Sequence, residues 1–595
     1  MNVKTTPPSI VRALKTLHVY ISTGPRHCSQ CARIAIAAPT LRVCSIGVML
    51  SASRLSARRL TAFLRRSQQR HLFSCTVVSN AKPIDIPTDL SLFDLMRGRA
   101  NWSEAPSEQA ALTCGATGAT VSYFELEGRV LGAGHALQQS GFQQGDILAI
   151  HIHNCNEWVI GFLATAACGG TSTASSPSYT SAELANQLRD SGASYMLTAE
   201  AYRAVAEEAA QMVGIPSHRI AFIEDKAAFV HAPATSKELA LQRPISALTD
   251  LLTIPYSSGT TGAPKGVMLS HFNVVANALQ VTNGGHLPDS SLRLTDIDRI
   301  LAVLPFYHIY GMCVLLVGAL LKRASIVIMP SFEPQTFLTA IQDHRITKAH
   351  LVPPIILFLA KADVVSKYDL SSLETVFSGA APLSQATADA LSSRLGLRVS
   401  NGYGLTEASP VICSGGIEHG SSGFLLPNIS AKVIDLESGE ALPRGSEGEL
   451  CVLGPNNMMG YWNRPEATSE AFTADGWLRT GDMARIDAQG NVIVGDRLKE
   501  FIKVKAFQVA PAELEGALLE HDEVLDACVV GVPDDRSGEA PKAFVVRKNG
   551  STLTVDDLSA MLKSRLAEYK QPREIHFVQN IPKSPAGKIL RRLLL

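Results

Sequence analysis

The chain has 595 residues, 46% of them hydrophobic, and is long enough for at least two globular domains. Its 54 basic and 54 acidic residues balance overall, but the first 84 residues carry 13 Lys and Arg and no Asp or Glu. Without those 13, 41 basic residues stand against 54 acidic ones, and this acidic body argues against a nucleic-acid-binding protein.

The segment 1–83 has the composition of a mitochondrial transit peptide, since it is rich in Arg, Ser and Ala and lacks acids. From Met49 onward, Leu, Phe and Arg are spaced as in a basic amphipathic helix, whereas the part before Met49 shows no periodicity. We therefore expect a mitochondrial protein, with a cytoplasmic one as the alternative, and a biological start at Met49. The uncharged run 43–53 is too short to span a membrane, and no transmembrane segment is visible elsewhere.

From residue 84 onward, short apolar runs alternate with helical stretches. The pattern predicts strands at 147–152, 300–304 and 325–329 and a helix at 181–191. Such alternation predicts an α/β fold with largely parallel sheets, layered with helices in a large N-terminal domain over 84–496.

Two patterns in this part resemble ligand-binding motifs but do not predict a site. The Gly-Ala-Gly at 132–134 begins like a dinucleotide fingerprint, but the third glycine is missing and the segment reads as mid-helix. His151 and His153 share one strand face, yet no third metal ligand is near, so a structural role is favoured.

The 11 cysteines are scattered singly through apolar segments, which predicts buried thiols in a reducing compartment rather than disulfides. Examples are Cys168, Cys313, Cys451 and Cys528. Cys28 and Cys31 form one C-x-x-C pair, but without a second pair they predict no zinc site.

Residues 256–266 read Tyr-Ser-Ser-Gly-Thr-Thr-Gly-Ala-Pro-Lys-Gly and predict a loop that holds a triphosphate. Its glycines let successive backbone N–H groups face one anion, its hydroxyls add donors, and its lysine adds a positive charge. An apolar strand at 251–255 leads into the loop, and the spacing differs from that of the Walker loop. The expected phosphate-binding residues are Ser257, Ser258, Gly259, Thr260, Thr261, Gly262 and Lys265.

Near residue 497 the chain becomes more charged. Strands are predicted at 527–532 and 543–547 and a helix at 555–568. We place a domain boundary at 496–499 and expect 497–595 to form a small α+β domain.

Six further motifs follow the loop in a fixed order. They are LPFYHIYG at 304–311, SGAAPL at 378–383, NGYGLTE at 401–407, TGD at 480–482, DRLKE at 496–500 and PKSPAGK at 582–588. Together with the loop they resemble the adenylate-forming enzymes, which include acyl-CoA synthetases, 4-coumarate–CoA ligases and beetle luciferases. The likeness covers nearly everything after residue 84, and the segments 352–355 and 367–373 are most similar to 4-coumarate–CoA ligases and their fatty-acid-using relatives.

The resemblance implies an ATP-dependent acid–CoA ligase with a mobile C-terminal lid. It would activate a hydroxycinnamate-like or medium-chain fatty acid as an acyl adenylate with ATP and Mg²⁺, and pass the acyl group to coenzyme A as a thioester. No nucleic acid or obligate protein partner is implied. The alternatives are a luciferase-like or stand-alone adenylating enzyme that does not use coenzyme A, and a nucleotide-binding relative without turnover.

The resemblance also assigns nucleotide contacts. Thr406 and Glu407 would lie at the α-phosphate and the metal, Asp482 at the ribose hydroxyls, and Tyr403 on the adenine. Further expected nucleotide contacts are Gly379, Ala380, Ala381, Asn401, Gly402, Gly404, Arg497 and the hinge residue Lys499.

The remaining assignments concern the acid and coenzyme A. Lys588 would bridge the α-phosphate and the carboxylate, Lys503 and Gln508 would serve the thioester step, and His308 would gate the pantetheine tunnel. The acyl pocket would be lined by Tyr310, Gly379, Ala380, Gly404, Pro410 and Val411. The family has glycine where this chain has Ala506, a departure that predicts a slowed thioester step, and Leu453 replaces a common arginine without known consequence.

Overall fold

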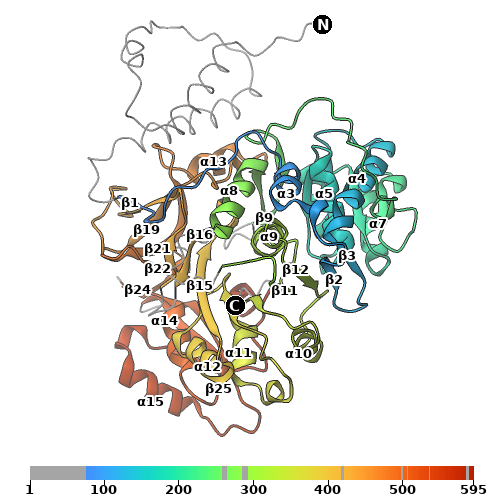
Figure 1. Cartoon of the computed structure of the whole chain (residues 1–595). Helices are drawn as coiled ribbons and strands as arrows, with labels where there is room; N and C mark the ends of the chain where they lie inside the picture. Colours follow the sequence, from blue (N-terminus) through green and yellow to red (C-terminus); the bar gives the residue numbers. More distant parts are fainter. Residues whose placement is uncertain are drawn as a thin grey trace, which may run out of the picture. The chain divides into compact units, whose positions relative to one another are not determined.

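The structure, a computed structural model, describes residues 76–257, 264–283, 293–416, 421–497, 500–504, 507–534, 537–584 and 589–595. Of residues 496, 497, 507, 508, 564 and 592 only the backbone is described. All of these residues belong to one compact unit, Leu55–Leu595, traced from blue to red in Figure 1. The predicted leader lies almost wholly outside the described residues.

The first large sheet has eight strands, in the order β20-β10-β8-β5-β4-β6-β7, with β9 paired to β10. The strands from β8 to β7 are parallel, whereas β10 pairs antiparallel with β8, β9 and β20. Every residue of β4 is buried, as expected for a parallel strand covered on both faces. The strands are β4 Ile147–His151, β5 Thr171–Ala174, β6 Tyr195–Thr198, β7 Ile220–Phe222, β8 Leu251–Thr253, β9 Tyr256–Ser257, β10 Lys265–Ser270 and β20 Gly460–Tyr461.

The second large sheet has nine strands, in the order β17-β16-β15-β14-β13-β11-β12-β2-β3. The inner strands from β15 to β2 are parallel, which confirms the predicted sheet type. Their carboxyl ends therefore meet at one edge. The strands are β2 Ala110–Cys114, β3 Thr120–Ser122, β11 Arg299–Ala302, β12 Ser325–Ile328, β13 Lys348–Leu351, β14 Thr375–Ser378, β15 Arg398–Gly404, β16 Val411–Gly416 and β17 Gly423–Leu425.

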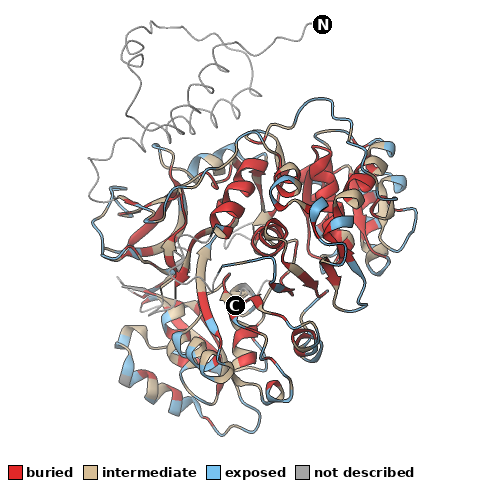
Figure 2. Ribbon diagram, viewed as in Figure 1, coloured by how far each residue is buried: buried red, intermediate tan, exposed pale blue. Residues whose placement is uncertain are grey.

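Helices connect the strands of both sheets, and α5 contacts both β4 and β2. It is buried on every side apart from Glu157, as an apolar helix between two layers should be, and it is red in Figure 2. The predicted helix 181–191 is α6, and the Gly-Ala-Gly at 132–134 lies inside α4, as expected. The helices are α3 Leu92–Ala100, α4 Tyr123–Gln139, α5 Asn156–Ala167, α6 Ser181–Ser191, α7 Arg203–Val213, α8 His271–Thr282, α9 Gly318–Lys322, α10 Pro334–Asp343, α11 Pro353–Lys361, α12 Gln385–Leu395 and α13 Pro465–Glu470.

A third, antiparallel sheet has the order β1-β18-β19-β21-β22. Its buried side chains join the core that the two large sheets share. The strands are β1 Thr76–Val78, β18 Ser430–Ile434, β19 Gly448–Leu453, β21 Leu478–Ile486 and β22 Val492–Arg497.

The residues after 500 form a five-stranded sheet with two helices and a core of their own. Both predicted strands lie within longer ones, and the predicted helix 555–568 is three residues too long, because Leu566 is already extended. The elements are β23 Ile502–Val504, β24 Phe507–Val509, α14 Pro511–Leu519, β25 Val524–Asp534, β26 Gly538–Arg547, α15 Val555–Arg565 and β27 Glu574–Phe577. The domain boundary at 496–499 stays a prediction.

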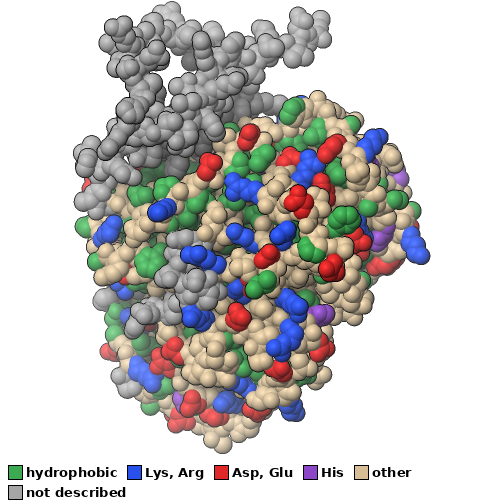
Figure 3. Space-filling view, in the orientation of Figure 1, with side chains coloured by type: hydrophobic (Ala, Val, Ile, Leu, Met, Phe, Trp, Pro, Cys, Tyr) green, Lys and Arg blue, Asp and Glu red, His purple; other side chains and the backbone are tan. Residues whose placement is uncertain are grey.

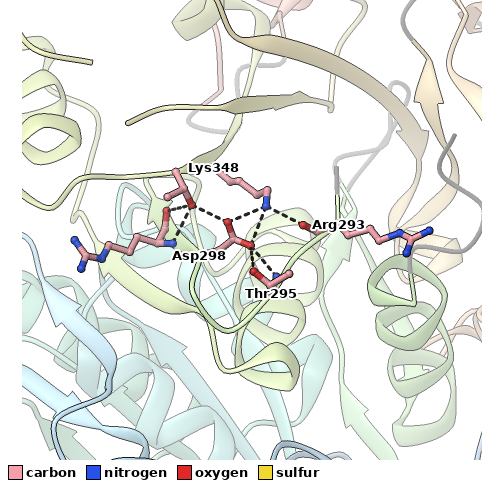
Figure 4. A network of polar contacts seen from close by, with 6 residues as sticks. Arg293, Thr295, Asp298 and Lys348 are labelled. Carbon is pink, nitrogen blue, oxygen red and sulfur yellow. Dashed lines mark hydrogen bonds and ion pairs between the residues drawn. The ribbon is translucent and has the colours of Figure 1, made fainter. Parts of the chain in front are cut away.

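A buried ion pair lies at the amino ends of β11 and β13, drawn in Figure 4. Lys348 Nζ donates to both carboxylate oxygens of Asp298 at 2.8 Å and to the carbonyl of Arg293 at 2.8 Å. The backbone N–H and hydroxyl of Thr295 also donate to Asp298. Because this network lies at the amino ends of the strands, opposite to the motifs 304–311 and 378–383, we assign it a structural role.

On the face shown in Figure 3, basic and acidic side chains are interspersed over the described surface. No helix among the described residues is long and apolar enough to cross a membrane, and none of their His, Cys, Asp and Glu side chains form a group of three suited to a metal. Seven cysteines lie in the described part of the chain, and all except Cys114 are buried, as predicted. Burial raises the pKa of each of these six thiols.

Candidate active site

The parallel strands bring several motifs to one edge of the nine-stranded sheet. The segment 304–310 follows β11, Gly379 and Ala380 follow β14, and the turn at 404–407 follows β15. Ligands of open parallel sheets bind at such carboxyl edges. The candidate site therefore lies at this edge.

The predicted phosphate loop lies between β9 and β10, which pair antiparallel. Ser257 of β9 stands opposite Lys265 of β10, and residues 258–263 between them lie outside the described residues. Tyr256 donates to the Asp190 carboxylate at 2.8 Å, and Trp462 donates to the Asp190 carbonyl at 2.9 Å. Asp190 therefore holds β9 and the segment after β20 together beside the loop. The prediction of a buried strand leading into the loop is confirmed by β8.

Lys265 and Glu407, predicted from separate motifs, are joined through Tyr461. The Lys265 ammonium lies 4.7 Å from the centroid of the Tyr461 ring, and the Tyr461 hydroxyl donates to Glu407 Oε1 at 2.8 Å. Pairing of β20 with β10 places Tyr461 here, since Tyr461 stands opposite Val267. The backbone carbonyl of Glu407 also accepts from Met458 N–H at 2.8 Å. Lys265, Tyr461 and Glu407 are thus connected in a row, which we call the Lys265–Tyr461–Glu407 stack.

The surroundings of Glu407 suit a magnesium ion. Glu407 is half-buried beside Thr406, and its second carboxylate oxygen has no partner among the residues that the structure describes. Mg²⁺ in proteins typically takes one or two carboxylates together with phosphate and water oxygens. One oriented carboxylate near a phosphate loop therefore fits such an ion.

Tyr403 and Asp482, which were predicted separately as adenine and ribose contacts, lie in contact with each other. The Tyr403 hydroxyl donates to Asp482 Oδ2 at 2.5 Å, joining β15 of the nine-stranded sheet to β21 of the antiparallel sheet. Burial, followed by the charge of Asp482, raises the pKa of Tyr403 well above its ordinary value. The phenol therefore stays protonated and keeps donating.

A buried carboxylate fixes the turn that carries Asp482. Glu449 of β19 is 3% exposed, accepts from Arg479 Nε at 3.0 Å and accepts from Gly481 N–H at 3.3 Å. Thr480 completes the turn, because its hydroxyl donates to the Leu450 carbonyl at 2.9 Å and accepts from Asp482 N–H at 3.2 Å.

The segment 304–310 is held from the other large sheet. Asn154, just beyond β4, accepts from Phe306 N–H and donates to the Leu304 carbonyl, both at 2.8 Å. The Phe306 ring packs on Trp158 of α5 at 5.3 Å. Because Asn154 takes over these backbone groups, β11 ends at Ala302, two residues before the predicted strand end.

Tyr310 covers the predicted acyl pocket beside Gly379. A methyl group on Gly379 would come within 3.0 Å of the Tyr310 ring, so this glycine leaves room for the aromatic side chain. The Tyr310 hydroxyl lies 3.2 Å from His350 Nδ1, and its backbone N–H donates to His308 Nδ1 at 3.2 Å. His308 and Tyr310 are thus in direct contact, and their role as a gate stays a prediction.

The other pocket residues come from the turn after β15. Gly404 packs against the carbonyl of Pro410, where an added methyl group would lie 2.0 Å away. Val411 is clamped by Asn277 of α8, which accepts from its N–H at 3.1 Å and donates to its carbonyl at 2.8 Å. Ala380 has φ 71° in the turn after β14.

The remaining predicted residues stand apart or are not described. Lys503 is exposed on β23, and no contact of the described residues joins it to the groups above. The side chains of Arg497 and Gln508 are not described, and Ser258, Gly259, Thr260, Thr261, Gly262, Lys499, Ala506 and Lys588 lie outside the described residues. Ala381, Asn401 and Gly402 lie at the edge described above, with Asn401 donating to the Ser421 carbonyl at 3.3 Å.

Sequence reasoning missed Tyr461, Asn154 and His350. Tyr461 lies in a Gly-Tyr-Trp run whose pairing with β10 is long-range, and Asn154 lies in a loop between two apolar segments. His350 lies inside a strand that reads as ordinary core. The signal that could have found His350 and Asn154 is a polar side chain within or next to apolar segments, since such a side chain needs a partner when it is buried.

Comparison with known proteins agrees with this geometry. The sequence pattern of the family described as AMP-binding enzyme matches residues 99–462, and that of the AMP-binding enzyme C-terminal domain matches residues 513–588. The chain is 37% identical over 523 residues to 4-coumarate–CoA ligase 5 of Oryza sativa subsp. japonica, covering 86% of this chain and 96% of the relative.

Two solved structures are similar over most of the chain. ATP-bound MatB from Rhodopseudomonas palustris superposes with a TM-score of 0.76 at 30% identity, covering 85% of this chain and 98% of MatB. The anthranilate CoA ligase AuaEII in complex with anthranoyl-AMP gives a TM-score of 0.77 at 25% identity, covering 86% of this chain and 97% of AuaEII.

Proposed function

The chain belongs to the AMP-binding enzyme family, and on that premise we propose that it is an ATP-dependent acid–CoA ligase. In the first step, an oxygen of the substrate carboxylate attacks the α-phosphorus of ATP. The bond from that phosphorus to the bridging oxygen breaks, so that pyrophosphate leaves and an acyl adenylate remains. In the second step, the coenzyme A thiol loses its proton and attacks the acyl carbonyl, and AMP leaves.

The Lys265–Tyr461–Glu407 stack is the observation that supports the proposal best. Two anions, a carboxylate and a triphosphate, must be brought together for adenylation, so the site needs cations and preorganised donors. Lys265 supplies a positive charge directly after the predicted phosphate loop, and Asp482 supplies an acceptor for a ribose hydroxyl. Lys265 lies in the eight-stranded sheet, Glu407 follows β15 of the nine-stranded sheet, and Asp482 lies in the antiparallel sheet.

We propose Glu407 as the protein ligand of Mg²⁺. The hydrogen bond from Tyr461 holds one carboxylate oxygen and leaves the other for the ion. Bound there, Mg²⁺ would neutralise phosphate charge. Thr406 would contribute a hydroxyl beside it.

The C-terminal residues serve both steps in this proposal. Lys588 bridges the α-phosphate and the carboxylate during adenylation, and Arg497 contacts the nucleotide beside the hinge at Lys499. Lys503 and Gln508 reach the site during thioester formation, while His308 gates access of the thiol. The acid is a hydroxycinnamate-like or medium-chain fatty acid in a pocket of Tyr310, Gly379, Gly404, Pro410 and Val411.

The proposal is tested with purified protein and a panel of cinnamic, benzoic and fatty acids. Exchange of labelled pyrophosphate into ATP reports adenylation, and thioester formation reports the second step. We expect both with at least one acid, and absence of exchange with every acid would refute the proposal.

Lys588→Ala separates the two steps. This variant should lose pyrophosphate exchange and still convert a supplied acyl adenylate to the thioester. The matched control is Lys570→Ala, which removes a lysine of the same domain that pairs with Glu513. An unaffected exchange rate in Lys588→Ala would contradict the role of this lysine.

We also propose that residues 1–83 direct the protein to mitochondria. The acid-free basic composition supports this. Sequencing the mature N-terminus from cells tests it, and an intact Met1 on a cytoplasmic protein would refute it.

A further inference from the structure

Asp190, near the end of α6, contacts two chain segments that lie beside β10, the strand that follows the predicted phosphate loop. Its Oδ2 accepts from the hydroxyl of Tyr256, a residue of β9, at 2.8 Å. After β20, Arg464 Nη2 donates to Asp190 Oδ1 at 2.7 Å, and Trp462 Nε1 donates to the Asp190 carbonyl at 2.9 Å. One residue outside every predicted motif thus joins the two neighbours of β10.

These two segments enclose the backbone of β10 directly after Lys265. Gly266 stands opposite Tyr256 in the pairing of β9 with β10, and its carbonyl accepts from Trp462 N–H at 2.8 Å. A methyl group on Gly266 would lie 3.2 Å from Tyr256 Cζ and 3.3 Å from Trp462 Cβ, so both side chains pack closely on this backbone. Because close-packed interiors transmit strain, a shift of either segment displaces the backbone next to Lys265.

The same contacts reach the Lys265–Tyr461–Glu407 stack. Tyr461 immediately precedes Trp462 in the chain. Its ring lies 4.7 Å from the Lys265 ammonium, and its hydroxyl donates to Glu407 at 2.8 Å. Asp190 therefore acts on Lys265 through β9 and on Tyr461 through the segment after β20.

The hydrogen bond from Tyr256 to Asp190 is kept near neutral pH. Burial, followed by the hydrogen bond and the charge of Asp190, raises the pKa of the Tyr256 phenol above its ordinary value. The phenol therefore stays protonated and keeps donating. Both Tyr256 and Trp462 pack against the apolar cluster that contains Leu184 and Leu188 of α6. The carboxylate thus accepts its hydrogen bond beside an apolar core, where such a bond is stronger than in water.

We propose that Asp190 is a positioning residue for the triphosphate end of ATP. It fixes Lys265, the cation assigned to the phosphates, and through Tyr461 it orients Glu407. It touches neither the nucleotide nor the acid. This inference rests on the proposed function of the same site. Because AMP carries one phosphate where ATP carries three, loss of this positioning should weaken ATP binding much more than AMP binding.

Direct binding of the two nucleotides tests this inference without any acid. Isothermal titration calorimetry of the purified full chain with Mg²⁺ gives the Kd for ATP and the Kd for AMP. Asp190→Ala removes both side-chain contacts. Asp190→Asn keeps an acceptor for Tyr256 but loses the charge that faces Arg464. Tyr256→Phe keeps the ring beside Gly266 and loses only the hydrogen bond.

Asp250→Ala is the matched control. Asp250 directly precedes β8, pairs with Arg243 at 2.6 Å and accepts from Ser246 N–H at 2.9 Å. Its side chain is 13% exposed, against 22% for Asp190, so the control loses a carboxylate–arginine pair of at least comparable burial. A general loss of stability should therefore affect both variants.

We expect the Kd for ATP to rise about tenfold in Asp190→Ala, and the Kd for AMP by less than about threefold. Asp190→Asn and Tyr256→Phe should show smaller rises for ATP, and the control should leave both constants unchanged. Equal weakening of ATP and AMP in Asp190→Ala would show a merely structural role and overturn the inference, as would an unchanged Kd for ATP. If Asp190→Ala does not fold, an unchanged Kd for ATP in both other variants overturns it.

Pyrophosphate exchange of the wild type with the acid panel separates this inference from the ligase proposal. Exchange with at least one acid, together with an Asp190→Ala variant that binds ATP normally, would refute the inference and leave the ligase proposal standing. Exchange with no acid, together with a selective loss of ATP binding in Asp190→Ala, would refute the ligase proposal and leave the positioning role standing. A wild type that does not bind ATP would refute both.

Discussion

Phe306 and Asn154 are joined across the two large sheets by a 2.8 Å hydrogen bond from the Phe306 backbone N–H to the Asn154 side chain. The same side chain donates to the Leu304 carbonyl at 2.8 Å. An asparagine at the carboxyl edge of one sheet thus fixes the segment that carries His308 and Tyr310 at the edge of the other. The position of these two side chains depends on a residue outside every motif.

Asn154→Ala should therefore impair use of the acid. It leaves one buried donor and one buried acceptor unpaired, each costing about 1–3 kcal/mol, and lets the segment 304–310 shift. We expect kcat/KM for the acid to fall at least about tenfold while KM for ATP changes little. Steady-state pyrophosphate exchange measures both.

Asn428→Ala is the matched control, because Asn428 accepts from Ile84 N–H and donates to the Ile84 carbonyl, both at 2.9 Å. Asn428 has φ 64°, so alanine there adds strain and the control loses at least comparable stability. Equal effects of the two variants on the acid KM would show that Asn154 acts through stability alone.

Tyr461→Phe should change the magnesium dependence of adenylation. The ring that Lys265 faces is kept, but the hydrogen bond that orients Glu407 is lost. We expect pyrophosphate exchange to drop about tenfold at low Mg²⁺ and to recover partly at high Mg²⁺. Tyr195→Phe, which removes a hydroxyl that donates to the Ser140 carbonyl at 3.2 Å, should leave the Mg²⁺ titration unchanged. An unaltered titration in Tyr461→Phe would argue against Glu407 as the ligand.

Asp298→Ala should be strongly destabilising. It leaves the Lys348 ammonium buried without its partner, which costs about 3–5 kcal/mol. Replacing both residues, as in Asp298→Leu with Lys348→Met, should restore much of the loss. Urea unfolding measures these differences, and Arg345→Ala, at a pair exposed 51% and 56%, should cost less than about 1 kcal/mol. A small effect of Asp298→Ala would contradict the assigned burial.

The same pair also gives a pH dependence. Burial alone would raise the pKa of Asp298, but hydrogen bonds from Lys348 and Thr295 outweigh it and lower the pKa. Its contribution is therefore present above the unfolded pKa of about 3.9 and is lost as the pH falls through the folded value.

Stability should already fall between pH 6.5 and pH 4, because three buried histidines take up protons only when the chain unfolds. Burial lowers the pKa of His151, His271 and His350 to about 4, from an ordinary value of 6.5. With more protons bound in the unfolded state, the unfolding free energy drops by up to about 1.4 kcal/mol per pH unit for each histidine. His151→Gln, which can keep the contact with Ser175, should reduce the slope by up to about 1.4 kcal/mol per pH unit. If the dependence of the unfolding free energy on pH were unaltered in this variant, His151 would not contribute to it.

Motifs and alternation were enough to predict much of the fold, and they named several of the residues that the structure brings together at the candidate site. The parallel sheets, α6 and the strand before the phosphate loop are as expected, because buried β-branched runs and helix caps are local signals. Lys265 and Glu407 were each recognisable from the residues around them, and the structure brings them together.

The linking residues could not be predicted, because they depend on long-range pairing. Tyr461 reaches Lys265 only because β20 adds to the edge beyond β10, and nothing near Tyr461 in the sequence specifies that partner. In β13, alternation places His350 on the same face as Lys348 but does not predict that Lys348 is closed off by an ion pair whereas His350 packs against aromatic rings. The early end of β11 likewise reflects a side chain from another sheet.

The burial of the six thiols has a practical consequence for following the second half-reaction. Each is held in its protonated, unreactive form and shielded from reagents, since the thiolate is the species that attacks disulfides. An aromatic disulfide added to folded protein would therefore react with the thiol of coenzyme A long before it reacted with these six, so these six would add nothing to the colour that reports the coenzyme left.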